Sequence, residues 1–244
     1  MISVERISKS YDEQVLKNVS LDIPGGKTIS LIGPSGCGKS TLLRIIMGLI
    51  DADSGRVMIN QQQLTDQNVL SLRRQMGYVI QSGGLFPHLT ARENLTLVTN
   101  YLGWESRQES DRIEELCELT NIAPPDLDRP PDGLSGGQAQ RISLMRALML
   151  DPDIILLDEP LGSIDPLVRY ELQRDLKSIF KKLKKTVLLV THDLGEAAYL
   201  GDQIALMKSG EIIQSGTIRD IVNNPANTFV EQFVNAQRSP LEDV

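Results

Sequence analysis

The segment from Gly33 to Ser40, GPSGCGKS, carries glycines, a lysine and a serine at the spacing G-x-x-x-x-G-K-[ST]. Glycines let the backbone curl until successive N–H groups converge on phosphate oxygens. Lys39 is then expected to reach the β- and γ-phosphates, and the Ser40 hydroxyl to bind Mg²⁺. A predicted strand at 28–32 precedes the segment and a predicted helix at 40–49 follows it, as this motif requires. A glycine-rich turn with a surface lysine is the alternative, and the context favours a nucleoside triphosphate site.

Two carboxylates, Asp158 and Glu159, follow the run Ile154 to Leu157, which is apolar at every position. Such a run is typical of a strand covered on both faces. In a P-loop protein, Asp158 at the end of this strand is well placed to hold the metal through water. Glu159 would lie closer to the γ-phosphate and polarise the attacking water. An exposed acidic turn before Pro160 is the alternative, and the phosphate loop favours catalysis.

His192 follows a second apolar run, 186–190, and is predicted to lie at the sheet edge where open α/β folds bind ligands. An imidazole there could hydrogen-bond the γ-phosphate and sense its presence. A lone histidine is more often structural or solvated, so on its own this residue leaves both interpretations open. The other histidine, His88, is predicted to be a loop or contact residue.

The segment Leu134 to Gln138, LSGGQ, opens a predicted helix that runs to about Leu150. Ser135 is a candidate N-cap, and the glycines leave N–H groups exposed, which makes a second anion-binding helix end. One nucleotide does not need two helix N-termini far apart in sequence. A head-to-tail dimer resolves this, with Ser135 and Gly137 of one copy capping the nucleotide that the other copy holds.

Together with the P-loop, the segment 134–138 resembles the signature of the ATP-binding cassette (ABC) ATPases, and the resemblance covers nearly the whole chain. It implies an α/β fold: a P-loop NTPase (RecA-like) core with a mainly parallel sheet, an N-terminal antiparallel β subdomain and an inserted helical subdomain. It implies that Tyr11 stacks on adenine and that Gln81 touches Mg²⁺ and links the lobes. It places Asp165 in the D-loop, which contacts the dimer partner. Without the resemblance, Tyr11 would be interpreted as a packing residue and Gln81 as a polar loop residue.

The resemblance also implies ATP and Mg²⁺ as the bound molecules and supports Glu159 as general base, His192 as switch and Lys39 as a third catalytic residue. The residues expected to contact ATP are Tyr11, Gly33, Ser35, Gly36, Cys37, Gly38, Lys39, Ser40, Thr41, Gln81, Ser135, Gly137, Gln138 and Asp165. The expected metal ligands are Ser40, Gln81 and Asp158. The chain departs from the family pattern in two places. The usual Ser-Ala-Leu-Asp is Gly-Ser-Ile-Asp at 162–165, and Ala139 stands where many relatives have a polar residue.

The middle of the chain, about 89–150, is predicted to be mostly helical. Two Pro-rich stretches, 123–126 and 129–133, interrupt it and are expected to form loops. Near the C-terminal end, residues 204–207 and 212–213 are apolar and flank a short turn, which predicts a β-hairpin.

The whole chain, 1–244, is predicted to be a single ABC ATPase domain. Its α/β core with the β subdomain is expected at about 1–88 and 151–222, the helical subdomain at about 89–150, and a short tail at 223–244. Within the core, Pro166 opens a helix that ends in the basic run 181–185, and cations suit a helix C-terminus.

Composition limits the classes of function. The 25 Lys and Arg against 32 Asp and Glu give a net charge of −7, which argues against broad nucleic-acid binding. The two cysteines, Cys37 and Cys117, form no disulfide framework, which fits a reducing cytoplasm. No apolar run approaches the ~18–20 residues of a spanning helix, and the first residues lack the pattern of a secretion signal. We therefore expect an intracellular protein whose membrane role comes through a partner.

Within the family, the stretches 77–81, 84–90, 165–169 and 224–230 are similar to importer ATPases for osmoprotectants such as glycine betaine, choline and related quaternary amines. This likeness implies transmembrane permease subunits, with a permease helix docked near 82–90, and a substrate-binding protein in the same system. It implies a homodimer in the ATP-bound state, at the cytoplasmic face of the inner (plasma) membrane. ATP would close the dimer, and hydrolysis would release it and move the permease.

Many such ATPases carry a C-terminal extension of paired CBS modules. The chain stops about twenty residues past Pro225, so that mode of regulation is expected to be absent or supplied elsewhere. An ABC ATPase of lipid trafficking or other solute transport is the nearer alternative. A soluble ABC protein of DNA repair or translation is the more distant one, because such proteins show a long coiled coil or two cassettes, and neither fits in 244 residues.

Overall fold

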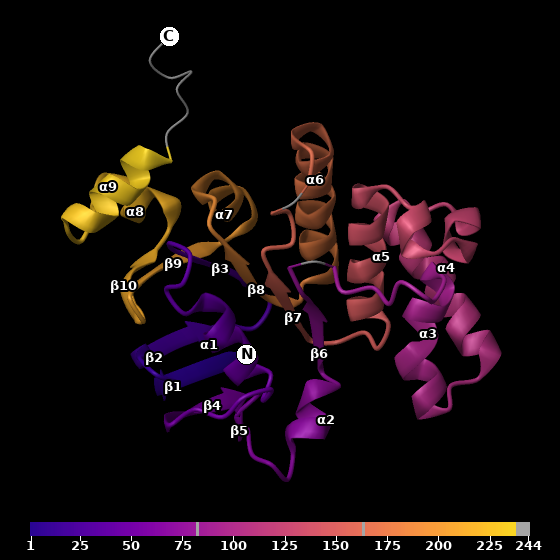
Figure 1. Ribbon diagram of the computed structural model, residues 1–244, viewed down its shortest axis with the longest axis horizontal. Coiled ribbons are helices and arrows are strands. Elements are labelled where there is room, and N and C mark those ends of the chain that lie inside the picture. The colour runs from indigo at the N-terminus through magenta and orange to yellow at the C-terminus, as the bar shows by residue number, and fades with distance from the viewer. Residues whose placement is uncertain (82, 163, 238–244) are drawn as a thin grey trace. The chain divides into compact units, whose positions relative to one another are not determined.

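The structure is a computed structural model that describes residues 1–81, 83–162 and 164–237 (Figure 1). The chain divides into two compact units: unit 1 combines residues 1–72 with the segment from Thr186 onward, and unit 2 is Arg73–Lys185. The boundaries between these units, after Leu72 and before Thr186, differ from the predicted limits of the helical subdomain, about 89 and 150. The limits of that subdomain stay a prediction. Among the described residues, no helix is both long and apolar enough to cross a membrane.

Unit 1 contains an antiparallel sheet built from residues between 2 and 63. Its strand order is β2-β1-β4-β5. The strands are β1 (Ile2–Ser10), β2 (Gln14–Ile23), β4 (Ser54–Ile59) and β5 (Gln62–Gln63). On β1, the side chains of Ile2, Val4 and Ile7 are buried, and a bulge at Arg6, with a φ of 50°, shifts the alternation by one residue. This sheet confirms the expected N-terminal antiparallel subdomain.

The second sheet of unit 1 has the strand order β10-β9-β3-β8. The strands are β3 (Thr28–Ile32), β8 (Thr186–Thr191), β9 (Gln203–Lys208) and β10 (Glu211–Gly216). Strand β3 runs parallel to β8 and to β9, and every residue of β3 and β8 is buried. Strands β9 and β10 form the predicted hairpin, whose turn residues Ser209 and Gly210 both have positive φ, as a two-residue turn requires. The sequence thus correctly predicted the parallel core.

The helices of unit 1 include α1, which follows β3, and three helices in the C-terminal segment. They are α1 (Lys39–Ile46), α7 (Leu194–Leu200), α8 (Ile218–Asn223) and α9 (Thr228–Ala236), and α2 (Val69–Arg73) spans the boundary with unit 2. The prediction that α1 runs to Leu49 was wrong. Gly48, with a φ of 64°, turns the chain in the left-handed region, and its N–H donates to the Ile45 carbonyl. This glycine ends the helix at Ile46.

Unit 2 pairs two parallel strands and carries most of the helices of the chain's middle part. The strands are β6 (Met76–Val79) and β7 (Ile154–Asp158). The helices are α3 (Ala91–Leu102), α4 (Ser106–Thr120), α5 (Gly136–Leu148) and α6 (Pro166–Leu183). Helix α5 packs against α3, α4 and α6. The predicted Pro-rich breaks form two short 3₁₀ helices, Pro124–Asp128 and Pro131–Gly133, each with proline in its first turn.

Candidate nucleotide site

The loop between β3 and α1 has the backbone of a phosphate-binding loop. Gly33, Gly36 and Gly38 have φ values of 151°, 77° and 108°, which side-chain-bearing residues rarely adopt. A Cβ atom on Gly33 would lie 2.1 Å from the carbonyl oxygen of Met207, and one on Gly38 would lie 2.7 Å from a methyl group of Leu16. Both positions therefore need glycine for conformation and for space.

Lys39 lies inside the curve of this loop. Its side chain is buried, and its Nζ donates to the carbonyl oxygens of Gly33 at 2.8 Å and Pro34 at 3.0 Å. Gly38 is the N-cap of α1 and has no side chain to cap it, so the first N–H groups of the helix face the loop beside the Lys39 charge. An ammonium group and a helix N-terminus on one loop favour binding of an anion.

Cys37 fills the base of the same loop. Its Sγ is 3.8 Å from the Lys39 Nζ, and burial raises the pKa of the Cys37 thiol more than the lysine charge lowers it. The thiol therefore stays neutral at neutral pH and acts as a small apolar side chain. The Gly210 N–H, in the β9–β10 turn, donates to the Cys37 carbonyl at 3.1 Å, a support for the loop that no sequence motif predicted.

His192 and the P-loop leave the same edge of the parallel sheet. Thr191, the last residue of β8, is in register with Ile32, the last residue of β3. The next residues along the chain are His192 and Gly33, so the structure brings these two predicted site segments together within unit 1. The His192 side chain is exposed, as an imidazole that contacts a ligand must be.

Tyr11 lies in the bend after β1, and its side chain is 58% exposed. The Lys9 Nζ lies 5.6 Å from the centroid of its ring, and Asp53 holds that ammonium at 2.9 Å. An exposed aromatic ring can stack on a base, and the adenine contact of Tyr11 stays a prediction.

Unit 2 brings Gln81 and Glu159 into contact. The Gln81 Nε2 donates to the Glu159 Oε2 at 3.0 Å. The contact arises because β6 and β7 are parallel, so the residues after their carboxyl ends meet at one edge. Asp158, the last residue of β7, is buried. Glu159 has a φ of 46°, a left-handed conformation that costs about 1–3 kcal/mol and turns the chain sharply out of the strand direction.

Ser135 is the N-cap of α5, as predicted. It forms a capping box with Gln138: the Ser135 Oγ accepts from the Gln138 N–H at 3.2 Å, and the Ser135 N–H donates to the Gln138 Oε1 at 2.9 Å. The Gln138 Nε2 donates to Asp126 at 2.8 Å. Gly137 is buried, and a Cβ atom there would lie 2.7 Å from a methyl group of Val168 on α6. The glycine therefore permits the close approach of α5 and α6.

Asp165 is exposed and caps α6, because its Oδ1 accepts from the Leu167 N–H at 3.0 Å. The Arg169 Nη2 donates to the Ile164 carbonyl at 3.1 Å, which fixes the chain just before Asp165. Ser163, part of the departure from the family pattern, lies outside the described residues, as does Ser82 at the start of the predicted permease contact.

Comparison with known proteins decides the family. The family model described as "ABC transporter" matches residues 16–162, more than half of the chain. The chain belongs to the ABC transporter family. This confirms the expected family, and with the two parallel sheet segments and the antiparallel sheet it confirms the expected fold class.

The curated relatives include the choline transport ATP-binding protein OpuBA of Bacillus subtilis (strain 168), 45% identical over 240 residues. That match covers 98% of this chain and 63% of OpuBA. The osmoprotectant import ATP-binding protein OsmV of Salmonella typhimurium (strain LT2) is 44% identical over 246 residues, with 98% of this chain and 64% of OsmV covered. The chain thus spans slightly less than two thirds of these relatives.

Two solved structures share the fold of this ABC chain. One is described as the dimeric structure of a bacterial ABC transporter cassette, with a TM-score of 0.80, 35% identity, and 90% of this chain and 99% of that chain covered. The other is the dimeric cassette in a post-hydrolysis state, bound to ADP and Pi, with a TM-score of 0.79 and 34% identity. The match extends over 90% of this chain in both cases.

The expected metal ligands, Ser40, Gln81 and Asp158, all offer oxygen atoms, which are the ligands that Mg²⁺ prefers. Because Gln81 donates its Nε2 to Glu159, its amide oxygen is the atom that can bind a cation. Across residues 1–81, 83–162 and 164–237, no three His, Cys, Asp or Glu side chains gather as a metal site.

Sequence reasoning missed the residues that hold the loop 83–86 in unit 2. Arg146 donates from Nη1 to the Gly84 carbonyl at 2.7 Å and from Nη2 to the Gly83 carbonyl at 3.0 Å. Ser143 also donates to the Gly83 carbonyl, and Asn94 binds both the N–H and the carbonyl of Phe86. Burial lowers the pKa of Arg146. In the sequence, these residues are visible only as polar positions on predicted helices. That pattern does not show which backbone groups their side chains bind.

Proposed function

We propose that this chain is the ATP-hydrolysing subunit of an ABC importer for quaternary-amine osmoprotectants. The similarity to proteins described as choline, glycine betaine/carnitine/choline and osmoprotectant import ATP-binding proteins supports the transported class. The observation that carries the ATPase activity is the pairing of Gln81 with Glu159 beside the buried Asp158. This contact brings a carboxylate and an amide together at one sheet edge, which supports Glu159 as the base.

The loop 33–40 binds the triphosphate in this proposal. The N–H groups of the curled loop and the first turn of α1 donate to phosphate oxygens. The Lys39 ammonium, which the Gly33 and Pro34 carbonyls hold in place, adds a positive charge whose position is fixed before ATP arrives. Its reorganisation on binding is therefore small, which favours the charged transition state.

Mg²⁺, when bound, neutralises the charge that develops on the β- and γ-phosphate oxygens. Ser40, Gln81 and Asp158 are the residues that we propose would hold it. Asp158 suits this role because it is a carboxylate at the end of a buried strand, where its backbone position is fixed.

Glu159 is proposed to act as the general base. A carboxylate oxygen accepts the proton of the attacking water while the water oxygen bonds to the γ-phosphorus, and the bond to the bridging oxygen of ADP breaks. Gln81 holds one carboxylate oxygen of Glu159 and so orients the other. His192 is proposed to hydrogen-bond the γ-phosphate from the sheet edge where the P-loop begins.

A homodimer completes the proposed site. Ser135 and Gly137 of a second copy would cap the ATP held by the first, and Asp165 would contact the facing copy. The dimeric cassettes of similar fold support this arrangement. We further propose that permease subunits dock on the segment 83–90 and that a substrate-binding protein serves the same importer. The chain would then lie at the cytoplasmic face of the inner (plasma) membrane, and we propose that it binds no nucleic acid.

Glu159→Gln tests the catalytic proposal. The amide can still accept from Gln81, so the fold should persist, but it cannot accept the proton, and hydrolysis should fall by about 10²–10⁴-fold. With ATP, size-exclusion chromatography with light scattering should show a stable dimer. Glu171→Gln, an exposed carboxylate on α6, is the matched control and should hydrolyse ATP normally. Hydrolysis by Glu159→Gln at the normal rate would show that Glu159 is not the base.

Uptake measurements test the transported class. Cells that express the chain with its permease subunits should accumulate radiolabelled choline or glycine betaine, and cells with Glu159→Gln should not. Uptake of neither compound, with ATP hydrolysis intact, would remove the osmoprotectant assignment and leave the ATPase assignment standing.

A further inference from the structure

Gln237, the C-cap residue that follows α9, contacts the backbone on both sides of Asp193. Its Nε2 donates to the His192 carbonyl at 3.0 Å, and its Oε1 accepts from the Leu194 N–H at 3.2 Å. One side-chain amide therefore joins two main-chain groups, 43 and 45 positions away in the sequence, that flank a single residue. These groups belong to the turn that presents the His192 imidazole.

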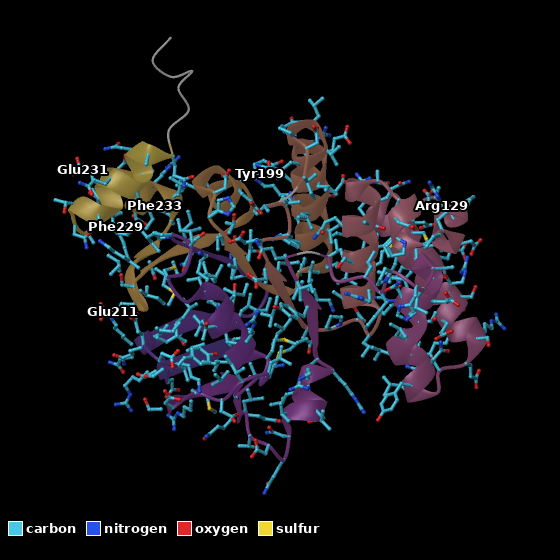
Figure 2. All side chains as sticks on the ribbon, viewed as in Figure 1. Arg129, Tyr199, Glu211, Phe229, Glu231 and Phe233 are labelled. Carbon is cyan, nitrogen blue, oxygen red and sulfur yellow. The ribbon has the colours of Figure 1, made fainter. Side chains whose placement is uncertain are left out.

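The helix that carries Gln237 is firmly packed. Val230 and Val234 on α9 are buried in a cluster that also contains Leu194 and Ala197 of α7 and Ile32 of β3. Phe229 packs against the same cluster, and the Lys208 Nζ lies 4.0 Å from its ring centroid. Phe229 and Phe233 are labelled in Figure 2, and their ring centroids are 6.0 Å apart.

These contacts fix Gln237 at the end of a helix rather than in a loose segment. The Gln237 N–H donates to the Val234 carbonyl at 3.1 Å, so its backbone completes the last turn of α9. Val234 itself is buried against α7 and β3. The amide thus reaches His192 from an element whose position the core determines.

The turn at His192 needs such support because regular pairing stops one residue earlier. The register of β8 with β3 ends at Thr191. Inside the turn, the Thr191 Oγ1 accepts from the Asp193 N–H at 3.1 Å, and the Asp193 Oδ1 accepts from the Glu196 N–H at 2.7 Å. Those bonds hold the turn from within, and Gln237 holds it from α9.

We infer that Gln237 is a positioning residue that sets the direction of the His192 side chain, and through it the rate of ATP hydrolysis. The inference rests on the proposed function, because it matters only if His192 contacts the γ-phosphate. Holding the carbonyl of residue 192 restricts the ψ angle of His192, and holding the N–H of residue 194 restricts the dihedrals of Asp193. The backbone at 192 sets the direction of the Cα–Cβ bond from which the imidazole extends. It links the C-terminal helix to the nucleotide site.

Glutamine suits this position for a chemical reason. The two main-chain partners need one donor and one acceptor, and an uncharged amide offers both. An ionised glutamate in its place would keep the acceptor for Leu194 but would put a charged oxygen against the His192 carbonyl. An asparagine would be one methylene shorter and would have to move the helix to reach both groups.

Gln237→Ala tests the inference, with Gln232→Ala as the matched control. Gln232 is a glutamine on the same helix with an exposed side chain. Two readouts are used: amide hydrogen exchange of the peptide that covers 191–196, and steady-state ATP hydrolysis. Loss of the bridge should speed exchange of the Leu194 N–H by at least about fivefold and lower kcat by about threefold to tenfold, with KM for ATP within twofold of wild type.

The cycle with His192→Ala separates positioning from a general effect on stability. If Gln237 acts through His192, Gln237→Ala should lower kcat in the wild-type background and change it less than 1.5-fold in the His192→Ala background. Equal fold-changes in both backgrounds, or an equal effect of Gln232→Ala, would overturn the inference.

Failure of the proposed function gives a different result. If the wild-type chain does not hydrolyse ATP, the catalytic assignments fall, and with them the effect on rate. The exchange experiment still decides the bridge: unchanged exchange at 191–196 in Gln237→Ala overturns it, and faster exchange supports it.

Discussion

Replacing Arg146 by methionine should release the loop that runs from Gly83 toward Thr90. Methionine keeps most of the length and apolar contact of the arginine stem but removes the guanidinium. In the structure that group donates to the Gly84 carbonyl at 2.7 Å and to the Gly83 carbonyl at 3.0 Å. Both bonds come from a charged donor that is partly buried, and this burial lowers the pKa of Arg146.

The magnitude follows from these two bonds. A hydrogen bond to a charged group contributes about 1.5–3 kcal/mol, so the pair contributes about 3–6 kcal/mol before compensation. The Gly84 carbonyl belongs to a half-exposed residue and can bind water once the guanidinium is gone, whereas Gly83 is buried and keeps only the bond from Ser143. We therefore expect a net loss of about 2–4 kcal/mol in the local stability of the loop.

Hydrogen exchange with mass spectrometry measures this loss directly. The Phe86 N–H is protected by the Asn94 Oδ1 at 2.8 Å, and the Leu89 N–H by the Phe86 carbonyl at 3.2 Å. At about 1.4 kcal/mol per factor of ten, a loss of 2–4 kcal/mol speeds exchange of these amides by about 30-fold to several-hundred-fold. Wild type and Arg146→Met are compared at neutral pH after equal exchange times.

Arg107→Met supplies the control, because Arg107 on α4 is 92% exposed and its nearest charged partner is 4.0 Å away. It should leave exchange of the 83–90 peptide unchanged and global stability within about 0.5 kcal/mol. If Arg146→Met exchanges within threefold of wild type, the guanidinium does not hold the loop and the reasoning fails. If the loop also docks a permease, Arg146→Met should lower uptake more than it lowers ATP hydrolysis by the isolated chain.

Three further predictions concern single contacts. Gly33→Ala should weaken ATP binding at least about 100-fold in a fluorescence titration, because the new Cβ would lie 2.1 Å from a carbonyl oxygen of β9. Gly25→Ala is the control and should bind ATP normally, since a Cβ there would meet no atom within 4 Å. Gln81→Ala should remove the hydrogen bond to the Glu159 carboxylate and lower kcat by about tenfold at saturating ATP and Mg²⁺, so an unchanged kcat would refute the pairing. Thr90, the N-cap of α3, donates to the Glu93 carboxylate and lowers the pKa of Glu93 below its ordinary 4.5. The stabilisation from this cap is therefore present above about pH 4.5 and is lost as the pH falls through the lowered pKa. NMR of the α3 amides should show fraying of the helix start at that lower pH, and a cap that does not depend on pH would contradict the prediction.

The sequence predicted the elements whose burial leaves a complete pattern. The runs 154–157 and 186–190 are apolar at every position because both faces of those strands are covered, and both became strands with one added residue. The end of α1 could not be predicted in the same way. Residues 47–50 continue an apolar pattern, and only the left-handed conformation of Gly48, which tertiary packing selects, ends the helix at Ile46.

Some of the site residues could likewise be predicted from local sequence, and others could not. The P-loop was predictable because its spacing alone dictates a backbone shape, and the cap at Ser135 because helix ends need side-chain acceptors. The reach of Lys39 to the Gly33 carbonyl and the contact between Gln81 and Glu159 depend on where side chains meet after folding. The latter joins residues 78 positions apart, and a periodic pattern carries no information about such a pair.

Three glutamines near the predicted nucleotide contacts share one physical property. Gln81 holds Glu159, Gln138 joins Ser135 to Asp126, and Gln237 bridges two main-chain groups beside His192. An amide can hold a donor and an acceptor at once without adding charge. At the nucleotide site that we propose, a carboxylate at any of these three positions would add a negative charge that repels phosphate groups. Neutral two-ended side chains can therefore hold neighbouring groups in place without changing the charge of the proposed site.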